Sequence, residues 1–226
     1  MILGAASLFF QPVLRKQIKL LLSFSGAFLL GLCVVHLLPT IFHSELSNPG
    51  LFILAGFFIQ ILLEYLSRGL EHGHIHLEDA SGNIPWVLMV SLSLHAFIEG
   101  MPFGHHHSHG GEHLDALLFG VVLHKAPVAI VLMTLFTQAQ FSRVKSLLAL
   151  AVFAVMAPLG AFAFGFFEST AHELSEIAMP AITAVLVGIL LHIATTILFE
   201  TSDGHHFNRW KFASIVIGVF LAWWIG

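Results

Sequence analysis

Long apolar runs, each close to the length of a membrane-spanning helix, follow one another along most of this 226-residue chain. A helix that crosses a bilayer needs about 20 predominantly apolar residues, within a range of about 17 to 25. Seven runs are of this kind: 20–38, 51–66, 84–104, 114–136, 147–167, 178–199 and 212–225. Because the runs are continuous and do not alternate with polar residues, they predict an all-α membrane bundle and not a membrane barrel.

The composition agrees with a chain surrounded by lipid. Hydrophobic residues make up 57% of the chain and charged residues only 10%, whereas soluble domains carry about 25% charged residues. This deficit excludes a solvated globular domain, a disordered chain and a basic nucleic-acid-binding surface. The single cysteine, Cys33, excludes an intrachain disulfide and a zinc site built from several thiolates.

A further apolar stretch, 1–14, precedes the seven runs and is short for a membrane span. Its basic residues follow the apolar stretch, whereas those of a signal peptide precede it. Counting this stretch as a short first span predicts about eight transmembrane helices in a single domain, 1–226.

The basic residues predict the orientation of these spans. Eight of the nine fall in alternate loops, while the loops around 43–48, 105–112 and 168–176 carry none. The eight are Arg15, Lys16, Lys19, Arg68, Arg143, Lys145, Arg209 and Lys211. Basic loops face the cytoplasm, so we expect both termini outside it, loop 67–83 inside and loop 105–113 outside.

Ionisable residues inside apolar spans are costly and usually face a bundle interior, a cavity or one another. His95 and Glu99 lie four residues apart and therefore share one helix face, and His124 lies near the centre of the next span. Pro102 and Pro127 stand close by, where each frees a backbone carbonyl. Two imidazoles and a carboxylate suit a borderline divalent ion such as Zn²⁺, with water or a fourth residue completing its coordination.

Four other polar residues mark a candidate pathway or modulating positions: Glu64, His36, His192 and Glu200. Glu64 and Glu200 lie near inner ends of their spans and are candidates for an exit route. A single membrane histidine such as His36 or His192 is also explained by a hydrogen bond to a neighbouring helix, and Glu200 by a role as a helix-end anchor.

Two histidine tracts fall in the predicted loops and account for half of the sixteen histidines. The inner tract is His72, His74 and His76, and the outer tract is His105, His106, His107, His109 and His113. Such tracts bind borderline metals weakly. The outer tract would then concentrate ions and the inner tract would receive or sense them, although passive solvated loops also fit.

Several of these segments resemble the ZIP (Zrt/Irt-like) family of divalent metal transporters. The sequence His-Ala-Phe-Ile-Glu-Gly at 95–100 is similar to the family's fourth-helix motif, and His124-Lys125 with Pro127 is similar to its fifth-helix motif. Segments 26–39, 158–160 and 188–200 extend the likeness in order along the chain.

The resemblance implies eight helices, with inverted three-helix repeats around helices four and five. It also implies that His95, Glu99 and His124 are the primary metal ligands. Where many members carry a polar residue and two acids, this chain has Ala96, Lys125 and Val128. A second metal ion is therefore not expected, and Lys125 is interpreted as a tethered cation in its place or as a proton carrier.

The leading hypothesis is a transporter, not an enzyme, that moves Zn²⁺ or another divalent first-row metal into the cytoplasm by alternating access. It needs no cofactor, and we expect it in a plasma membrane or a bacterial inner membrane, with a homodimer as the candidate assembly. Ion binding requires neutral imidazoles, so uptake should weaken as the external pH falls towards about 6.5. An intramembrane zinc-dependent hydrolase and a transport-inactive metal sensor are the alternatives.

Overall fold

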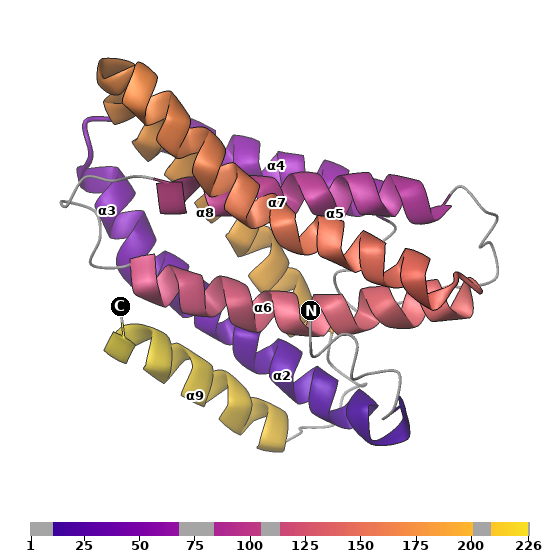
Figure 1. Ribbon diagram of the computed structural model, residues 1–226. Coiled ribbons are helices and arrows are strands. Elements are labelled where there is room, and N and C mark those ends of the chain that lie inside the picture. Colours follow the sequence, from indigo (N-terminus) through magenta and orange to yellow (C-terminus); the bar gives the residue numbers. More distant parts are fainter. Residues whose placement is uncertain (1–10, 68–83, 105–113, 201–208, 226) are drawn as a thin grey trace.

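The computed structural model describes residues 11–67, 84–104, 114–200 and 209–225, and within these residues all regular secondary structure is helical. Figure 1 shows long helices packed side by side, with most of their ends gathered at two sides of the molecule. The all-α membrane bundle predicted from the apolar runs is thus confirmed for the described part of the chain.

Every predicted run lies within a helix. In chain order the elements are α2 (Gln11–Leu32), the π-helical turn η1 (Cys33–Leu37), α3 (Leu38–His43), α4 (Pro49–Ser67), α5 (Ile84–Gly100), the 3₁₀ turn η4 (Met101–Gly104), α6 (Leu114–Gln138), α7 (Arg143–Thr170), α8 (His172–Glu200) and α9 (Arg209–Ile225). Because α2, η1 and α3 follow without a break, and η4 continues α5, the described residues form seven helical segments.

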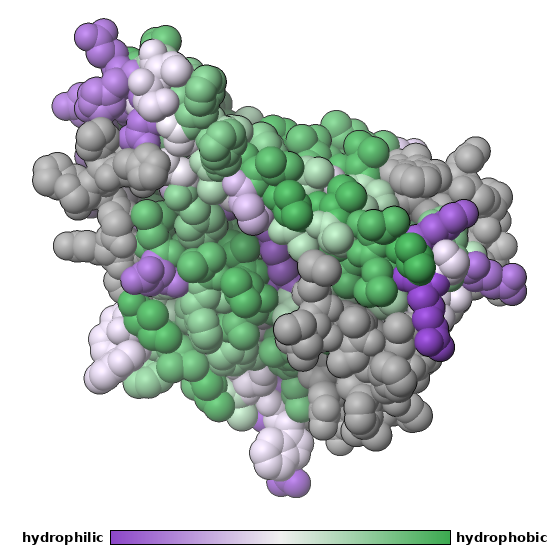
Figure 2. Space-filling model, in the orientation of Figure 1, coloured by the Kyte–Doolittle hydropathy of each residue, from purple (hydrophilic) through white to green (hydrophobic). Residues whose placement is uncertain are grey.

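Five of these segments are long and apolar enough to cross a membrane: 19–43, 49–66, 114–137, 143–170 and 172–199. Helices α5 and α9 are shorter, with 17 residues each. Figure 2 shows that hydrophobic side chains cover most of the visible middle of the molecule, while hydrophilic ones gather mainly towards its ends. That distribution suits a lipid-facing surface. The eighth span remains a prediction, because residues 1–10 lie outside the described residues.

The start of α2 corrects one predicted boundary. The sequence predicts Arg15, Lys16 and Lys19 in a loop after a first span, but the structure places all three within α2, which begins at Gln11. Lysine, arginine and leucine are strong helix formers, and Pro12 is tolerated in the first turn of a helix. The basic residues therefore extend the helix beyond its apolar part.

A second boundary also differs, at the predicted external loop 168–176. Helix α7 continues to Thr170 and α8 begins at His172, so only Ala171 separates them. The acidic Glu173 lies in the first turn of α8, where a negative charge stabilises a helix. Polar residues thus extend both helices beyond the ends of their apolar runs.

The helices pack in two groups. In the first group α4 lies along α8 and α2 lies along both α8 and α9, as Figure 1 shows for α2 and α9. In the second group α5 and η4 lie along α7, and α6 contacts both α7 and α2. One apolar cluster lies mainly among α2, α6 and α8, and a second lies among α5, α6 and α7.

The boundary between the two clusters falls in the middle of α6. Val121 belongs to the first cluster and Val128 to the second. His124 lies on α6 between these two residues and is buried. The packing therefore places a polar side chain at the junction of two apolar cores.

Candidate metal centre

The end of α5 brings a histidine and a glutamate together on one helix face. His95 and Glu99 are four residues apart, and His95 Nε2 lies 3.2 Å from Glu99 Oε1. The α-helical part of α5 ends at Gly100, and the 3₁₀ turn η4 follows with Pro102 as its second residue. Proline cannot donate the hydrogen bond that would continue the α-helix, so the helix geometry changes directly beyond Glu99.

Glycines set the position of this helix end against α7. A Cβ atom on Gly100 would overlap the carbonyl oxygen of Ala157. In the same way, a Cβ atom on Gly160 would overlap the carbonyl oxygen of Phe97. Small residues allow membrane helices to approach this closely. The backbones of α5 and α7 are therefore in direct contact beside Glu99.

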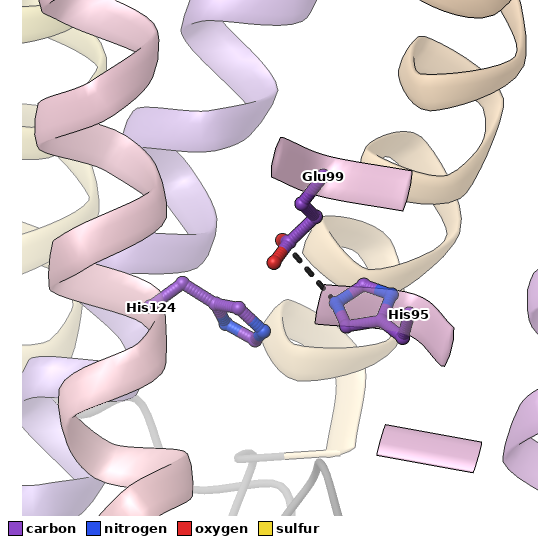
Figure 3. Close-up of side chains that lie close together, drawn as sticks. All are labelled: His95, Glu99 and His124. Atoms are coloured by element: carbon purple, nitrogen blue, oxygen red, sulfur yellow. Dashed lines mark ion pairs between the residues drawn. The ribbon is translucent and has the colours of Figure 1, made fainter. Parts of the chain in front are cut away.

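Helix α6 supplies the third side chain. The rings of His95 and His124 have centroids 6.3 Å apart and planes at 81°. One ligand atom from each of His95, Glu99 and His124 lies within 4.8 Å of the other two. Figure 3 shows the carboxylate and the two imidazoles turned towards a common space between α5 and α6. All three residues are buried, with at most 2% of their surface exposed.

Lys125 reaches the same carboxylate. Its Nζ lies 2.9 Å from Glu99 Oε2, while His95 contacts the other oxygen, so each oxygen of Glu99 has a basic neighbour. The Lys125 ammonium also lies 6.0 Å from the centre of the Phe153 ring. The sequence placed Lys125 next to His124, but the pairing with Glu99 depends on how α6 is rotated towards α5.

The positions at which this chain departs from the resembled motifs carry no ligand. Ala96 and Val128 are both buried in the second apolar cluster. Neither side chain offers a nitrogen or oxygen atom to a metal ion. The two histidines and one glutamate of the centre suit a single divalent ion bound through two nitrogens and one carboxylate.

Three of the four other polar positions make contacts across helices away from this centre. His192 Nε2 on α8 contacts Glu64 Oε2 on α4. His36 Nε2 lies 3.1 Å from the backbone oxygen of Ala222, near the end of α9. His36 and His192 therefore both make the interhelical contacts that the sequence allows, while their roles on a pathway stay predictions. The pairing of His192 with Glu64 was not predicted from the sequence.

The remaining predictions for site residues lie outside what the structure describes. Glu200 is the last residue of α8, and its side chain is outside the described part. Both histidine tracts also lie outside the described residues: His72, His74, His76, His105, His106, His107, His109 and His113. Their roles stay predictions.

The comparison with known protein families agrees with the geometry of the centre. The family model described as ZIP Zinc transporter matches residues 70–225, which is more than half of the chain and includes His95, Glu99, His124 and Lys125. No solved structure gives a significant match. Members of this family carry metal ions across membranes, and the described helices are apolar enough to span one. This chain belongs to the ZIP zinc transporter family.

Proposed function

We propose that this protein carries Zn²⁺ into the cytoplasm through a centre formed by His95, Glu99 and His124. The observation that carries the proposal is the convergence of two imidazoles and a carboxylate from two helices in a buried position. Burying an ionised group in an apolar bundle costs free energy unless it is paired or binds a metal. A divalent ion bound by these side chains would offset the free-energy cost of burying the carboxylate.

The donor atoms favour zinc among the divalent ions. Magnesium and calcium prefer sites built from oxygen atoms, whereas imidazole nitrogen suits zinc and the neighbouring first-row metals. Three protein ligands leave a coordination position for water. A carrier has to release its ion, and an incomplete protein shell permits exchange of this kind.

Lys125 supplies the positive charge that a second metal ion would otherwise bring. Its ammonium lies against Glu99, and Ala96 and Val128 offer no further ligand. We infer a mononuclear centre in which the arriving ion competes with Lys125 for the carboxylate. As the ion binds, the lysine moves away from Oε2.

The two packing groups support a mechanism of alternating access. The contacts at Gly100 and Gly160 hold α5 against α7, so we propose that these two helices move together relative to α2, α4, α8 and α9. Helix α6 contacts both groups and would lie at the boundary of the movement. The centre then opens to one side of the membrane at a time. The distribution of basic residues predicts which face of the protein is cytoplasmic. We propose that the ion is released at that face, with Glu64 and Glu200 on the route of release.

The pairing of Glu99 with Lys125 also favours a second candidate function, that of a metal sensor without transport. If the lysine stays in place, the ion binds without passing through. The two candidates differ in one measurement, which is zinc uptake into proteoliposomes containing a zinc-sensitive dye.

The transporter predicts uptake that saturates with zinc concentration and exceeds the leak of protein-free vesicles. Binding of zinc to the purified protein without such uptake would favour the sensor and overturn the transport proposal. Protein that fails to bind zinc at all would contradict both.

A further inference from the structure

A second histidine–glutamate pair lies in the other packing group, and the centre described above does not include it. Glu64 on α4 and His192 on α8 are 128 residues apart in the sequence, yet Nε2 of the histidine contacts Oε2 of the glutamate. Their side chains are 20% and 13% exposed, respectively, whereas those of His95 and Glu99 are almost fully buried. This pair is therefore less deeply buried than the centre.

The helices that carry the pair are held together without it. A Cβ atom on Gly56 would overlap the carbonyl oxygen of Val185, and one on Gly188 would overlap that of Ile53. The backbones of α4 and α8 are thus already in contact, so a polar clamp is not needed to join them. A substituted side chain at the pair should therefore leave the crossing intact.

An aromatic ring sets the orientation of the imidazole. The Phe57 ring meets the His192 ring edge to face, with centroids 4.8 Å apart and planes at 81°. Such contacts restrict the rotation of both rings. The nitrogen that contacts Glu64 is consequently directed towards the carboxylate before any ligand arrives.

Helix α5 connects the metal centre to the neighbourhood of this pair. Ser91, His95 and Glu99 follow one another at intervals of four residues and share a helix face. Ser91 Oγ donates a hydrogen bond of 2.7 Å to the backbone oxygen of Leu63, the residue before Glu64. Four residues of helix span about 6 Å, so Ser91 lies about two turns from Glu99, on the side of the predicted cytoplasmic face.

We propose that Glu64 and His192 form a second divalent-metal site, which receives the ion from the centre at Glu99 on its way to the cytoplasm. The ion bonds to His192 Nε2 and Glu64 Oε2, the proton held between these atoms passes to water, and water fills the other positions. Two protein ligands bind an ion more weakly than three, which suits a transient site from which the ion dissociates quickly. The position on the route rests on the proposed function, but metal binding by the pair does not.

A ligand exchange tests the site by spectroscopy. In a Cys33→Ala background, Glu64→Cys replaces the carboxylate with a thiolate, and Co²⁺ bound to a thiolate absorbs in the near-ultraviolet. The histidine tracts cannot produce this charge-transfer band. Tyr65→Cys in the same background is the matched control, because Tyr65 is adjacent in sequence and 80% exposed.

The proposal predicts that Glu64→Cys gives a band that rises with Co²⁺ concentration and saturates. Adding His192→Ala should weaken Co²⁺ binding at least about tenfold, a change of about 1.4 kcal/mol, and Tyr65→Cys should give no band. Absence of the band in Glu64→Cys, or a band that does not depend on His192, would show that the pair is only an interhelical contact.

Zinc uptake tests the position on the route separately. Glu64→Gln and His192→Gln should each lower the maximal rate of uptake at least about tenfold while zinc binding at the centre is unchanged. Wild-type uptake rates in both variants would remove the pair from the route. If the wild-type protein carries no zinc but the Glu64→Cys band forms, the transport proposal fails and the second site stands.

Discussion

At the scale of single residues, Glu99 is the side chain around which the centre is organised. One oxygen faces His95 and the other faces Lys125, and His124 completes the group from the neighbouring helix. A carboxylate with two basic neighbours stays ionised and ready for a cation. Under the proposed function, the lysine therefore competes with the ion for the same carboxylate.

Removal of the lysine charge should therefore strengthen metal binding. A unit charge about 4 Å from another interacts by about 4 kcal/mol at an effective dielectric constant of 20. We expect Lys125→Gln to bind zinc at least about tenfold more tightly, as measured by competition with a chromophoric chelator. The background would carry alanine at all eight tract histidines.

Lys145→Gln is the control for this experiment, because Lys145 is an exposed residue in the first turn of α7. It removes the same charge at a distance from Glu99 and should leave the affinity unchanged. If Lys125→Gln binds zinc as weakly as the wild type or more weakly, the lysine is part of the binding site and does not compete with the ion.

The sequence predicted the three ligands but not all of their neighbours. The i, i+4 spacing fixes His95 and Glu99 on one face whatever the tertiary structure, and the burial of a histidine in the next span placed His124 at a similar depth. The contact of Lys125 with Glu99 and that of Glu64 with His192 depend on the relative rotation of two helices. Continuous apolar runs carry little information on that rotation.

At the scale of helices, backbone contacts at glycines position the site. Gly100 and Gly160 hold α5 against α7 on either side of the same crossing. We expect Gly100→Ala to destabilise the protein by about 1–3 kcal/mol, the usual cost of overpacking. Thermal unfolding in detergent would show this loss as a lower melting temperature.

Gly50→Ala provides the comparison, because no atom lies within 4 Å of the position that its Cβ would take. In a helix, alanine replaces glycine with a gain of up to about 1 kcal/mol. Equal melting temperatures for Gly100→Ala and Gly50→Ala would mean that α5 and α7 are not packed as closely as described.

Helix boundaries were less predictable than helix positions. Each apolar run lies within a helix, but α2, α7 and α8 extend beyond their runs into polar sequence. Hydropathy marks only the part of a helix that lies in lipid. It does not detect turns such as those at Arg15 or Glu173, in which helix-forming polar residues prolong the same helix into water.

At the scale of the whole molecule, the arrangement of charge predicts one orientation in the membrane. Single cysteines in a Cys33→Ala background test it. Ser47→Cys lies after α3 on the predicted external side, and Val144→Cys lies between Arg143 and Lys145 on the predicted cytoplasmic side. Both positions are exposed.

With intact cells, a membrane-impermeant maleimide should label Ser47→Cys and leave Val144→Cys unlabelled. Val144→Cys should be labelled only after the membrane is permeabilised. The reverse pattern would invert the orientation and with it the proposed direction of transport. Labelling of both positions would contradict the placement of 49–137 as an odd number of crossings between them.

The central claim is that the transported ion binds to His95, Glu99 and His124. Zinc uptake into proteoliposomes tests it most directly when the wild type is compared with Glu99→Ala, His124→Ala and a matched histidine control. His172→Ala is suitable, because the His172 side chain is 53% exposed at the start of α8.

The claim predicts that Glu99→Ala and His124→Ala reduce zinc uptake to the leak of protein-free vesicles, while His172→Ala transports like the wild type. Zinc uptake at the wild-type rate in either Glu99→Ala or His124→Ala would contradict it.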